Sequence, residues 1–229
     1  MAKRSKRYQA AAKLLDTTKA YDLPEAVEIL TKMPKPKFDA TINLAIRLGV
    51  DPKKAEQAVR GTISLPHGVG KERKVLVFAK GEKAQEAQTA GADFVGDKEL
   101  IEKVAGGWME FDVAIATPDL MRDVSRLGKA LGPRGLMPSP KSGTVTEDVG
   151  KAVGEFKKGK VSFKNDAYGI VHVVAGKASF PKEKIVENIE AIFGTLHRMK
   201  PASAKGQYVV SSYLSAAMAP SIKLNTAKL

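Results

Sequence analysis

The middle third of the chain alternates between short apolar runs and polar, helix-forming stretches. The apolar runs KVLVFA at 74–79, DFVGD at 93–97 and FDVAIATP at 111–118 are each short enough for a buried strand. A stretch of helical composition that ends at glycine follows each run, and Asp119 is the expected N-cap of the last helix. This order predicts a parallel, doubly wound sheet with helices on both faces.

The two flanks of this middle region carry a different pattern. Stretches with one apolar face, typical of helices, occur at 8–15, 23–33 and 181–200. Asp22 and Pro24 open the second stretch as the expected N-cap and first-turn residues. Alternating apolar and polar residues, typical of strands with one polar face, occur at 40–51 and 206–218. Residues 161–176 predict a β-hairpin around the turn sequence Asn-Asp-Ala-Tyr-Gly.

Strands that pair across the middle region would join both flanks into one domain. We therefore expect an α+β split domain formed by both termini, at 1–67 and 160–229. The inserted α/β domain is expected at 68–159, with three layers and a mainly parallel sheet. The two crossings, near LPHGVGKE and EFKKGK, are rich in glycine and charge, which suggests a hinge.

The charge of the chain is unevenly distributed between these regions. The formal net charge is +13 over 229 residues. Basic residues outnumber acidic ones by 13 to 7 in 1–67 and by 10 to 4 in 160–229, a net +6 each, whereas 68–159 has 15 and 14. Because a basic surface gains affinity for nucleic acid by releasing counterions, the flanks are expected to bind RNA or DNA. An anionic lipid surface is the competing partner.

The residues that several other kinds of site require are missing. The chain has no cysteine, and its three histidines, His67, His172 and His197, lack a metal-binding spacing, so we expect no metal and no cofactor. No apolar stretch reaches the roughly 18 to 20 residues of a membrane helix, and the basic N-terminus lacks the apolar core of a signal peptide. We therefore expect a cytoplasmic protein.

The α/β pattern raises the hypothesis of a nucleotide-dependent enzyme. The turn after the first strand has only Gly81 where a dinucleotide fingerprint needs three glycines. The HGVGKE segment carries Glu72 where a phosphate loop needs Ser or Thr. No pair of carboxylates and no Ser-His-Asp order stands out, so we expect that the chain is not an enzyme.

Residues 127–146 form the most unusual stretch, with four glycines and three prolines. The basic residues Lys129, Arg134 and Lys141 lie in it. This stretch is either a rigid surface connection or a contact, to RNA phosphates or between domains.

Three further features leave two interpretations open. The basic run at 3–7 is either a solvated arm or, beside Tyr8, a contact to an RNA backbone. Phe38, which lies among basic residues, is either a core side chain or one that packs on a ribose or base. Met218 is either a hydrophobic strand end or part of the same contact.

Several long motifs, in a consistent order, carry a resemblance to a known family. They are KFDAT from 37, LGVDPKKAEQAVRGTISLPHGVGK from 48, AGADFVG from 90, FDVAIATPD from 111, LGPRGLMPSPKSGTV from 131 and KNDAYGIVHVVAGKASF from 164. Together they resemble the L-one family of ribosomal proteins, bacterial large-subunit proteins of the mobile stalk beside the tRNA exit site. The resemblance covers nearly the whole chain.

The resemblance implies a split α+β domain, an inserted Rossmann-like α/β domain, and RNA binding chiefly through the split domain. It implies a structural constituent of the large subunit that binds large-subunit ribosomal RNA and helps release deacylated tRNA from the exit site. It also implies repression of translation through a similar RNA fold in the protein's own operon mRNA, and a monomer when free. The alternative is a free RNA-binding translational regulator that does not join the ribosome stably.

The motif positions also imply which residues contact RNA. These are Lys37, Phe38, Thr41, Lys164, Asn165, Asp166, Gly169, His172, Ser215, Ala217, Met218 and Ala219. A secondary RNA contact is expected at Lys129, Arg134 and Lys141. The last motif departs from the family pattern S-T-T-M-G, because the chain reads Ser-Ala-Ala-Met-Ala at 215–219. Two hydroxyl groups and a glycine are therefore absent from the expected contact.

Overall fold

The computed structural model describes residues 4–71 and 73–226, and the chain divides into two compact units. The first unit combines Met1–Gly70 with Phe163–Leu229, and the second contains Lys71–Ser162. Among the described residues, no helix is long and apolar enough to cross a membrane. Whether these units correspond to independent domains at 1–67 with 160–229 and at 68–159 stays a prediction.

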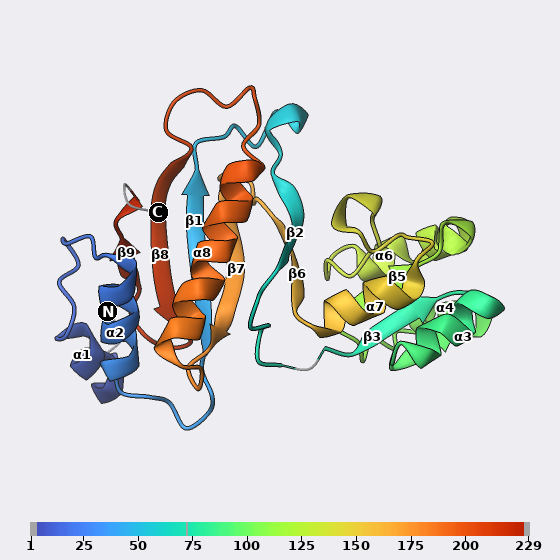
Figure 1. Cartoon of the computed structure of the whole chain (residues 1–229), viewed down its shortest axis with the longest axis horizontal. Helices are drawn as coiled ribbons and strands as arrows, with labels where there is room; N and C mark the ends of the chain where they lie inside the picture. The colour runs from blue at the N-terminus through green and yellow to red at the C-terminus, as the bar shows by residue number, and fades with distance from the viewer. Residues whose placement is uncertain (1–3, 72, 227–229) are drawn as a thin grey trace. The chain divides into compact units, whose positions relative to one another are not determined.

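The first unit is built around a four-stranded antiparallel sheet in the order β7-β1-β8-β9 (Figure 1). Its strands are β1 (Thr41–Leu48), β7 (Ile170–Lys177), β8 (Val209–Ala216) and β9 (Ile222–Leu224). The central strand β1 pairs on both sides with strands from the other flank, so that Leu44 lies opposite Val173 and Leu214. Segments more than 120 residues apart in the chain therefore share one core.

Helices cover only one face of this sheet. The amphipathic helices α2 (Leu23–Lys32) and α8 (Lys182–Arg198) contact each other and the sheet, and α8 lies across it in Figure 1. Their apolar faces bury Val27, Leu30 and Ile189 among others. A short helix, α1 (Lys6–Ala12), precedes them and is capped by the Ser5 side chain. Along β1, buried side chains alternate with exposed or half-buried ones, so the opposite sheet face stays open.

The expected β-hairpin at 161–176 is wrong. The strand β6 (Lys160–Lys164) pairs with β2 (Arg60–Ser64) in a separate two-stranded sheet, whereas β7 pairs with β1. Only the isolated antiparallel bridge between Asn165 and Val171 remains of a hairpin. The alternation identified both strands correctly, but it does not specify the partner of each strand. A short 3-10 helix, η1 (Ala55–Gln57), precedes β2.

The first crossing segment is anchored in the first unit by Asn188, a fully buried residue of α8. The Asn188 amide nitrogen donates to the carbonyl oxygens of Gly68 (3.1 Å) and Ala175 (2.8 Å). Its side-chain oxygen accepts from the backbone N–H of His67 at 3.2 Å. These bonds pair the polar atoms of a buried amide, whose burial without partners would cost free energy. They also hold residues 67 and 68 in place where the chain leaves the first unit.

The second unit has a three-stranded parallel sheet in the order β4-β3-β5. The strands are β3 (Val75–Phe78), β4 (Phe94–Gly96) and β5 (Val113–Ala116), and every residue of β3 and β5 is buried. The helices α3 (Glu82–Thr89) and α7 (Val149–Lys157) cover one face, and α4 (Lys98–Ala105) with the segment 118–131 covers the other. The mixed α/β class and the parallel sheet are thus confirmed.

The last expected helix of this unit is broken into short pieces. They are η2 (Pro118–Leu120), α5 (Met121–Val124), η3 (Ser125–Leu127) and α6 (Gly128–Leu131), with η4 (Pro140–Ser142) farther along. Asp119 lies inside η2 and Thr117 occupies the cap position, so the expected cap at Asp119 is wrong. Pro118 is tolerated at the first position of a helical turn, so the helical segment begins two residues earlier than expected.

Candidate nucleic-acid interface

Three chain segments meet at one end of the open sheet. They are residues 34–41 before β1, residues 177–179 after β7, and residues 215–219 at the end of β8, and we call them the sheet-end site. The Ala178 N–H donates to the Ala40 carbonyl at 2.8 Å, and the Ala217 N–H donates to the Thr41 carbonyl at 2.9 Å. The structure therefore brings together the two predicted groups at 37–41 and 215–219.

Two large apolar side chains of this site are exposed to solvent. Phe38 is 49% exposed and Met218 is 69% exposed. Met218 has a φ of 61°, and no other non-glycine residue among the described ones has a positive φ. Such a conformation costs on the order of 1 to 3 kcal/mol and persists only where neighbouring contacts impose it. The strain holds an apolar side chain out of the core, where it is available to a partner.

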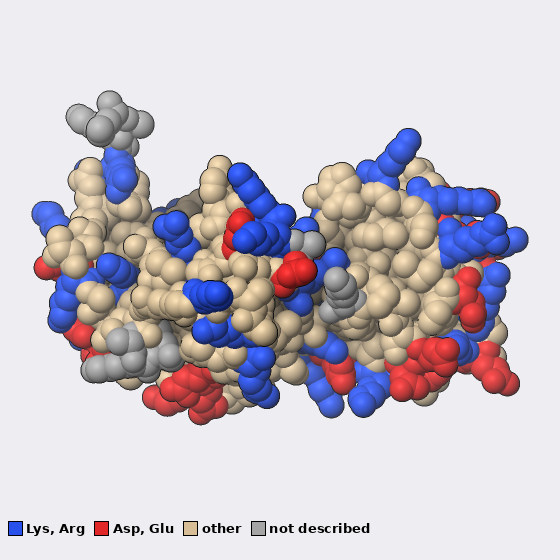
Figure 2. Space-filling model, turned by 90° about the horizontal axis from the view of Figure 1, so that it is seen from above, with Lys and Arg blue, Asp and Glu red and all other residues tan. Residues whose placement is uncertain are grey.

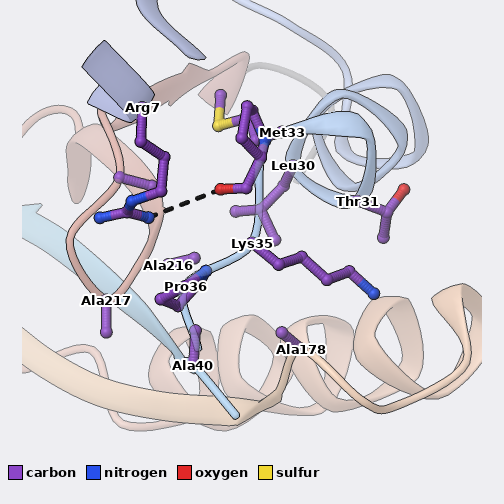
Figure 3. A pocket seen from close by; sticks show the side chains of 12 residues that line it. Arg7, Leu30, Thr31, Met33, Lys35, Pro36, Ala40, Ala178, Ala216 and Ala217 are labelled. Carbon is purple, nitrogen blue, oxygen red and sulfur yellow. Dashed lines mark hydrogen bonds between the residues drawn. The ribbon is translucent and has the colours of Figure 1, made fainter. Parts of the chain in front are cut away.

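Arg7 of α1 supplies the contacts that fix this end of the sheet. One guanidinium nitrogen donates to the Met218 carbonyl at 2.9 Å. The other donates to the Pro34 carbonyl at 3.5 Å, the bond drawn as a dashed line in Figure 3. Arg7 thereby connects the two loops that carry Phe38 and Met218. The sequence pattern marked the basic arm at 3–7 as an RNA contact or a solvated segment, but it did not indicate this structural role.

A small apolar pocket lies behind the Arg7 contact (Figure 3). It has room for about one water molecule, near 20 Å³. Its lining includes the methyl groups of Ala216, Ala217 and Ala219, the residues that depart from the family motif. The missing hydroxyl groups thus leave an apolar surface beside Met218.

Polar contacts order the other side of the sheet-end site. The Asp39 carboxylate accepts hydrogen bonds from the Ser179 N–H (3.1 Å) and hydroxyl (2.9 Å). The Lys177 ammonium donates to the Thr41 hydroxyl at 2.9 Å and to the Asp39 carbonyl at 3.5 Å. Lys177 was not among the predicted contacts, although it lies in the motif that begins at 164. Lys37 is exposed beside these groups.

The other predicted group, at 164–172, forms a tight turn that we call the Asp166 turn, residues 165–170. One Asp166 carboxylate oxygen accepts from the N–H groups of Tyr168 and Ile170, both at 2.8 Å. The hydrogen bond from Ile170, together with that from Tyr168 and the nearby charge of His172, holds the pKa of Asp166 below its ordinary value. Asp166 therefore stabilises the turn as a carboxylate.

The remaining residues of this group divide into structural and exposed ones. Gly169 has a φ of +75°, and a Cβ there would lie 3.2 Å from the Leu48 carbonyl oxygen, so the turn requires glycine. Asn165 is buried, and its side-chain oxygen has no hydrogen-bond partner among the described residues. Lys164 and His172 are exposed. The latter lies with its Nε2 3.8 Å from Asp166.

The sheet-end site and the Asp166 turn lie at opposite ends of β1. The sheet-end site adjoins Thr41, whereas the Leu48 N–H donates to the Gly169 carbonyl of the Asp166 turn at 2.9 Å. Seven residue steps of a strand separate these ends by roughly 23 Å. The sequence predicted both ends but not the strand face that connects them.

The open sheet face between the two ends combines polar and basic side chains with a few aliphatic ones. Directly paired residues share a face, so the strand registers give its members as Asn43, Ala45, Arg47, Ile170, His172, Val174, Ser211, Tyr213, Ser215 and Lys223. None of these described positions is acidic. Tyr213 is 39% exposed near the middle. The alternation in 40–51 and 206–218 predicted strands with one polar face, and the strand registers add which residues share that face.

The secondary contact residues belong to the second unit. Lys129 of α6 and Arg134 in the following turn are exposed, and the side chain of Lys141 lies outside the described residues. The loop around them is bonded internally, because Thr144 accepts from the Ser139 N–H at 2.8 Å and pairs with the Ser142 hydroxyl at 2.9 Å. This geometry agrees with a rigid surface connection that exposes two cations.

Overall charge does not locate the interface. Figure 2 shows one face of the molecule, on which Lys and Arg side chains are spread widely and smaller acidic groups lie among them. Among the described residues, no group of three or more His, Asp or Glu side chains could hold a metal ion. The exposed apolar side chains and the acid-free sheet face identify the interface more sharply than the charge.

Comparisons with known proteins connect this geometry to a family. The model of the ribosomal protein L1p/L10e family matches residues 30–220. The large ribosomal subunit protein uL1 of Kosmotoga olearia is 56% identical over 229 residues, which cover 100% of this chain and 99% of that protein. The family match includes every segment of the sheet-end site but begins after Arg7.

Proposed function

The chain belongs to the ribosomal protein L1p/L10e family, and on that basis we propose that the sheet-end site and the Asp166 turn bind large-subunit ribosomal RNA. As a member of this family it is a ribosomal protein of the large subunit and not an enzyme. It is located in the ribosome, in the bacterial cytoplasm.

The observation that carries the proposal is the open sheet face, which has the sheet-end site at one end and the Asp166 turn at the other. Structured RNA is bound through cations that contact phosphates and through exposed side chains that pack on bases or riboses. Phe38 and Met218 supply exposed apolar surface at one end, and Arg47, His172 and Lys223 lie along the face. An acid-free surface of this kind suits a polyanion.

We further propose that the bound RNA is the mobile stalk beside the tRNA exit site, so that the protein helps deacylated tRNA to leave. A similar RNA fold in the protein's own operon mRNA would allow it to repress its own translation. We propose that the free protein is a monomer. These proposals rest on family membership. The stalk and messenger proposals also share one requirement, that the same site binds a similarly structured RNA.

The binding proposal is tested by titrating the full chain with an RNA fragment of the large-subunit stalk over a range of salt concentrations. With roughly four to eight phosphate contacts, log affinity should fall with log salt at a slope near −0.7 to −0.9 per contact. Affinity that barely changes between low and moderate salt would contradict the electrostatic part. Co-sedimentation with large subunits in high salt separates a ribosomal component from a free regulator.

We also propose that residues 1–67 with 160–229 form the RNA-binding domain and that 68–159 form an inserted domain. A chain that joins the two flanks by a short linker should then fold and keep most of the RNA affinity. A cooperative melt combined with a loss of affinity greater than about 150-fold, near 3 kcal/mol, would place the main site in the insert.

A further inference from the structure

Tyr168 is the most exposed of the large hydrophobic side chains in the described part of the chain, at 79%. It lies at the tip of the Asp166 turn, and neither the motif resemblance nor the sheet-end geometry assigns it a role. At this exposure most of the ring surface is accessible to a partner, and a partner that covered it would gain apolar contact area.

The turn that carries Tyr168 is held rigidly. The Asp166 N–H donates to the Ile170 carbonyl at 2.8 Å, and the Gly169 N–H donates to the Asp166 carbonyl at 3.2 Å. The Tyr168 N–H donates to the Asp166 carboxylate, and the Leu48 N–H of β1 donates to the Gly169 carbonyl of the turn. Because the backbone is already ordered, little conformational entropy remains to be lost when the ring meets a ligand.

Basic residues lie on the strands that adjoin the Asp166 turn. Lys164 ends β6 and is exposed, and Arg47 lies opposite Ile170 in the sheet register. The side chain of His172 is 66% exposed and lies two pairs farther along the sheet, opposite Ala45. The one acidic group of the turn, Asp166, is engaged with backbone N–H groups. An exposed ring beside cations fits a nucleotide, in which a flat base is flanked by phosphates.

We infer that Tyr168 is a stacking platform for one unpaired base of ribosomal RNA, as a second contact point about 23 Å from the sheet-end site. A double-stranded segment would not suffice, because stacked and paired bases do not offer a face to a tyrosine ring. The inference rests on the proposed RNA-binding function. It adds the class of nucleotide that the Asp166 turn recognises.

The test compares Tyr168→Ala and Tyr168→Phe in the full chain, with the stalk RNA fragment of the large subunit as probe. Stacking of a base on an aromatic ring predicts that Tyr168→Ala binds about 5- to 100-fold more weakly. Tyr168→Phe keeps the ring and should bind within about twofold of the parent chain. Neither change removes a charge, so the salt dependence should be unaltered. Leu14→Ala, at another exposed apolar residue, is the matched control and should bind normally.

The base itself is found by replacing each unpaired nucleotide of the fragment with an abasic one. One replacement should weaken binding by the parent chain but leave binding by Tyr168→Ala unchanged. Equal affinity of Tyr168→Ala and the parent, equal losses for Ala and Phe, or no coupled nucleotide would overturn the inference while the proposed function stands. If the parent chain fails to bind the fragment, the proposed function fails and the inference with it.

Discussion

The four-stranded sheet of the first unit and the three-stranded sheet of the second unit differ in how many of their faces are buried. In the second unit, every residue of β3 and β5 is buried, and separate apolar clusters fill both faces of the sheet. In the first unit, β1 buries alternate residues against α2 and α8 and leaves the others on an open face. The parallel sheet can therefore present functional groups only from its loops, whereas the antiparallel sheet presents them from the strands.

This difference determines how many positions of a strand are available for binding in each unit. A strand buried on both faces needs only apolar residues, and its sequence carries no information about a partner. A half-buried strand needs apolar residues at every second position and leaves the rest free for binding. Thr41, Asn43, Ala45 and Arg47 occupy those free positions of β1.

The comparison predicts the largest effect for apolar side chains of the sheet-end site. The double change Phe38→Ala with Met218→Ala should weaken binding of the stalk RNA fragment by about 30- to 1000-fold, because each removes a contact of roughly 1 to 2 kcal/mol. The paired change Lys129→Ala with Arg134→Ala in the second unit should cost less than about tenfold, since exposed cations contribute mainly through salt-dependent contacts.

Both pairs of changes concern exposed side chains, so thermal melts should be close to that of the parent chain and serve as controls for folding. Titrations at one fixed salt concentration compare the two pairs directly. A greater loss from the pair in the second unit would reverse the comparison and move the principal RNA site to the 127–146 loop.

The sequence predicted the elements of both units better than their pairing. Short apolar runs with glycine stops located β3, α3, β4, α4 and β5, because a fully buried strand and a helix that ends at glycine each leave a local signal in the sequence. β2 and β9 were missed, since each presents only two buried residues to a strand pattern. The hairpin was wrong because pairing of β6 with β2 is a long-range choice that local alternation does not encode.

A second prediction concerns Arg7, which the sequence marked only as part of a basic arm. Arg7→Ala removes the hydrogen bonds to the Met218 and Pro34 carbonyls, and we expect RNA affinity about 5- to 50-fold lower, from hydrogen bonds of a charged group. If Arg7 positions the loops, Arg7→Lys should restore little, because a lysine lacks the planar fork that spans two carbonyls.

The salt dependence distinguishes this role from a direct phosphate contact. A positioning role leaves the slope of log affinity against log salt unchanged in Arg7→Ala. A phosphate contact would lower the slope by nearly one unit and would be rescued by lysine. That second pattern would rule out Arg7 as the residue that holds Met218 in its left-handed conformation.

The candidate site was predictable as a set of residues but not as a geometry. Motif positions named Phe38, Thr41 and Met218, and the structure shows that backbone hydrogen bonds join their segments. The contribution of Lys177 and Arg7 could not be predicted, because each acts through a contact with a residue over 130 positions away. The open face between the two ends became visible only once the strand register was known.

The third prediction uses the departure from the family motif at 215–219. Ala217→Thr with Ala219→Gly should tighten RNA binding by about three- to thirtyfold, because a hydroxyl donor and bare backbone return to the contact. The Ala217 methyl lines the pocket beside Arg7, so a threonine there also fills apolar space. Ala219→Gly alone should gain less, since glycine raises the conformational entropy lost on binding.

The single changes are measured beside the double one at the same salt concentration. Unchanged or weaker binding by the double variant would mean that the alanine motif is not an impaired form of the family contact. In that case Ser215, which lies opposite Asn43 on the open face, is the hydroxyl that serves this end of the sheet.

The smallest effect is expected at Asp166, where the comparison can be sharpened by pH. The pKa of this carboxylate is held below its ordinary value of 3.8, chiefly by the Ile170 N–H. A lowered pKa means that ionised Asp166 stabilises the turn at all pH values above the ordinary one, and that this stabilisation is lost as pH falls through the lowered value. The amide signals of Tyr168 and Ile170 should therefore be constant from about pH 5 to 8 and change only in stronger acid.

Asp166→Asn keeps a side-chain oxygen for both N–H groups, so it should remove the acid transition and alter RNA affinity at neutral pH by less than about fivefold. Asp166→Ala, which lacks the acceptor, should loosen the turn at every pH. A tenfold or larger change in affinity for Asp166→Asn, with both amide signals unchanged, would instead make the carboxylate a direct RNA contact.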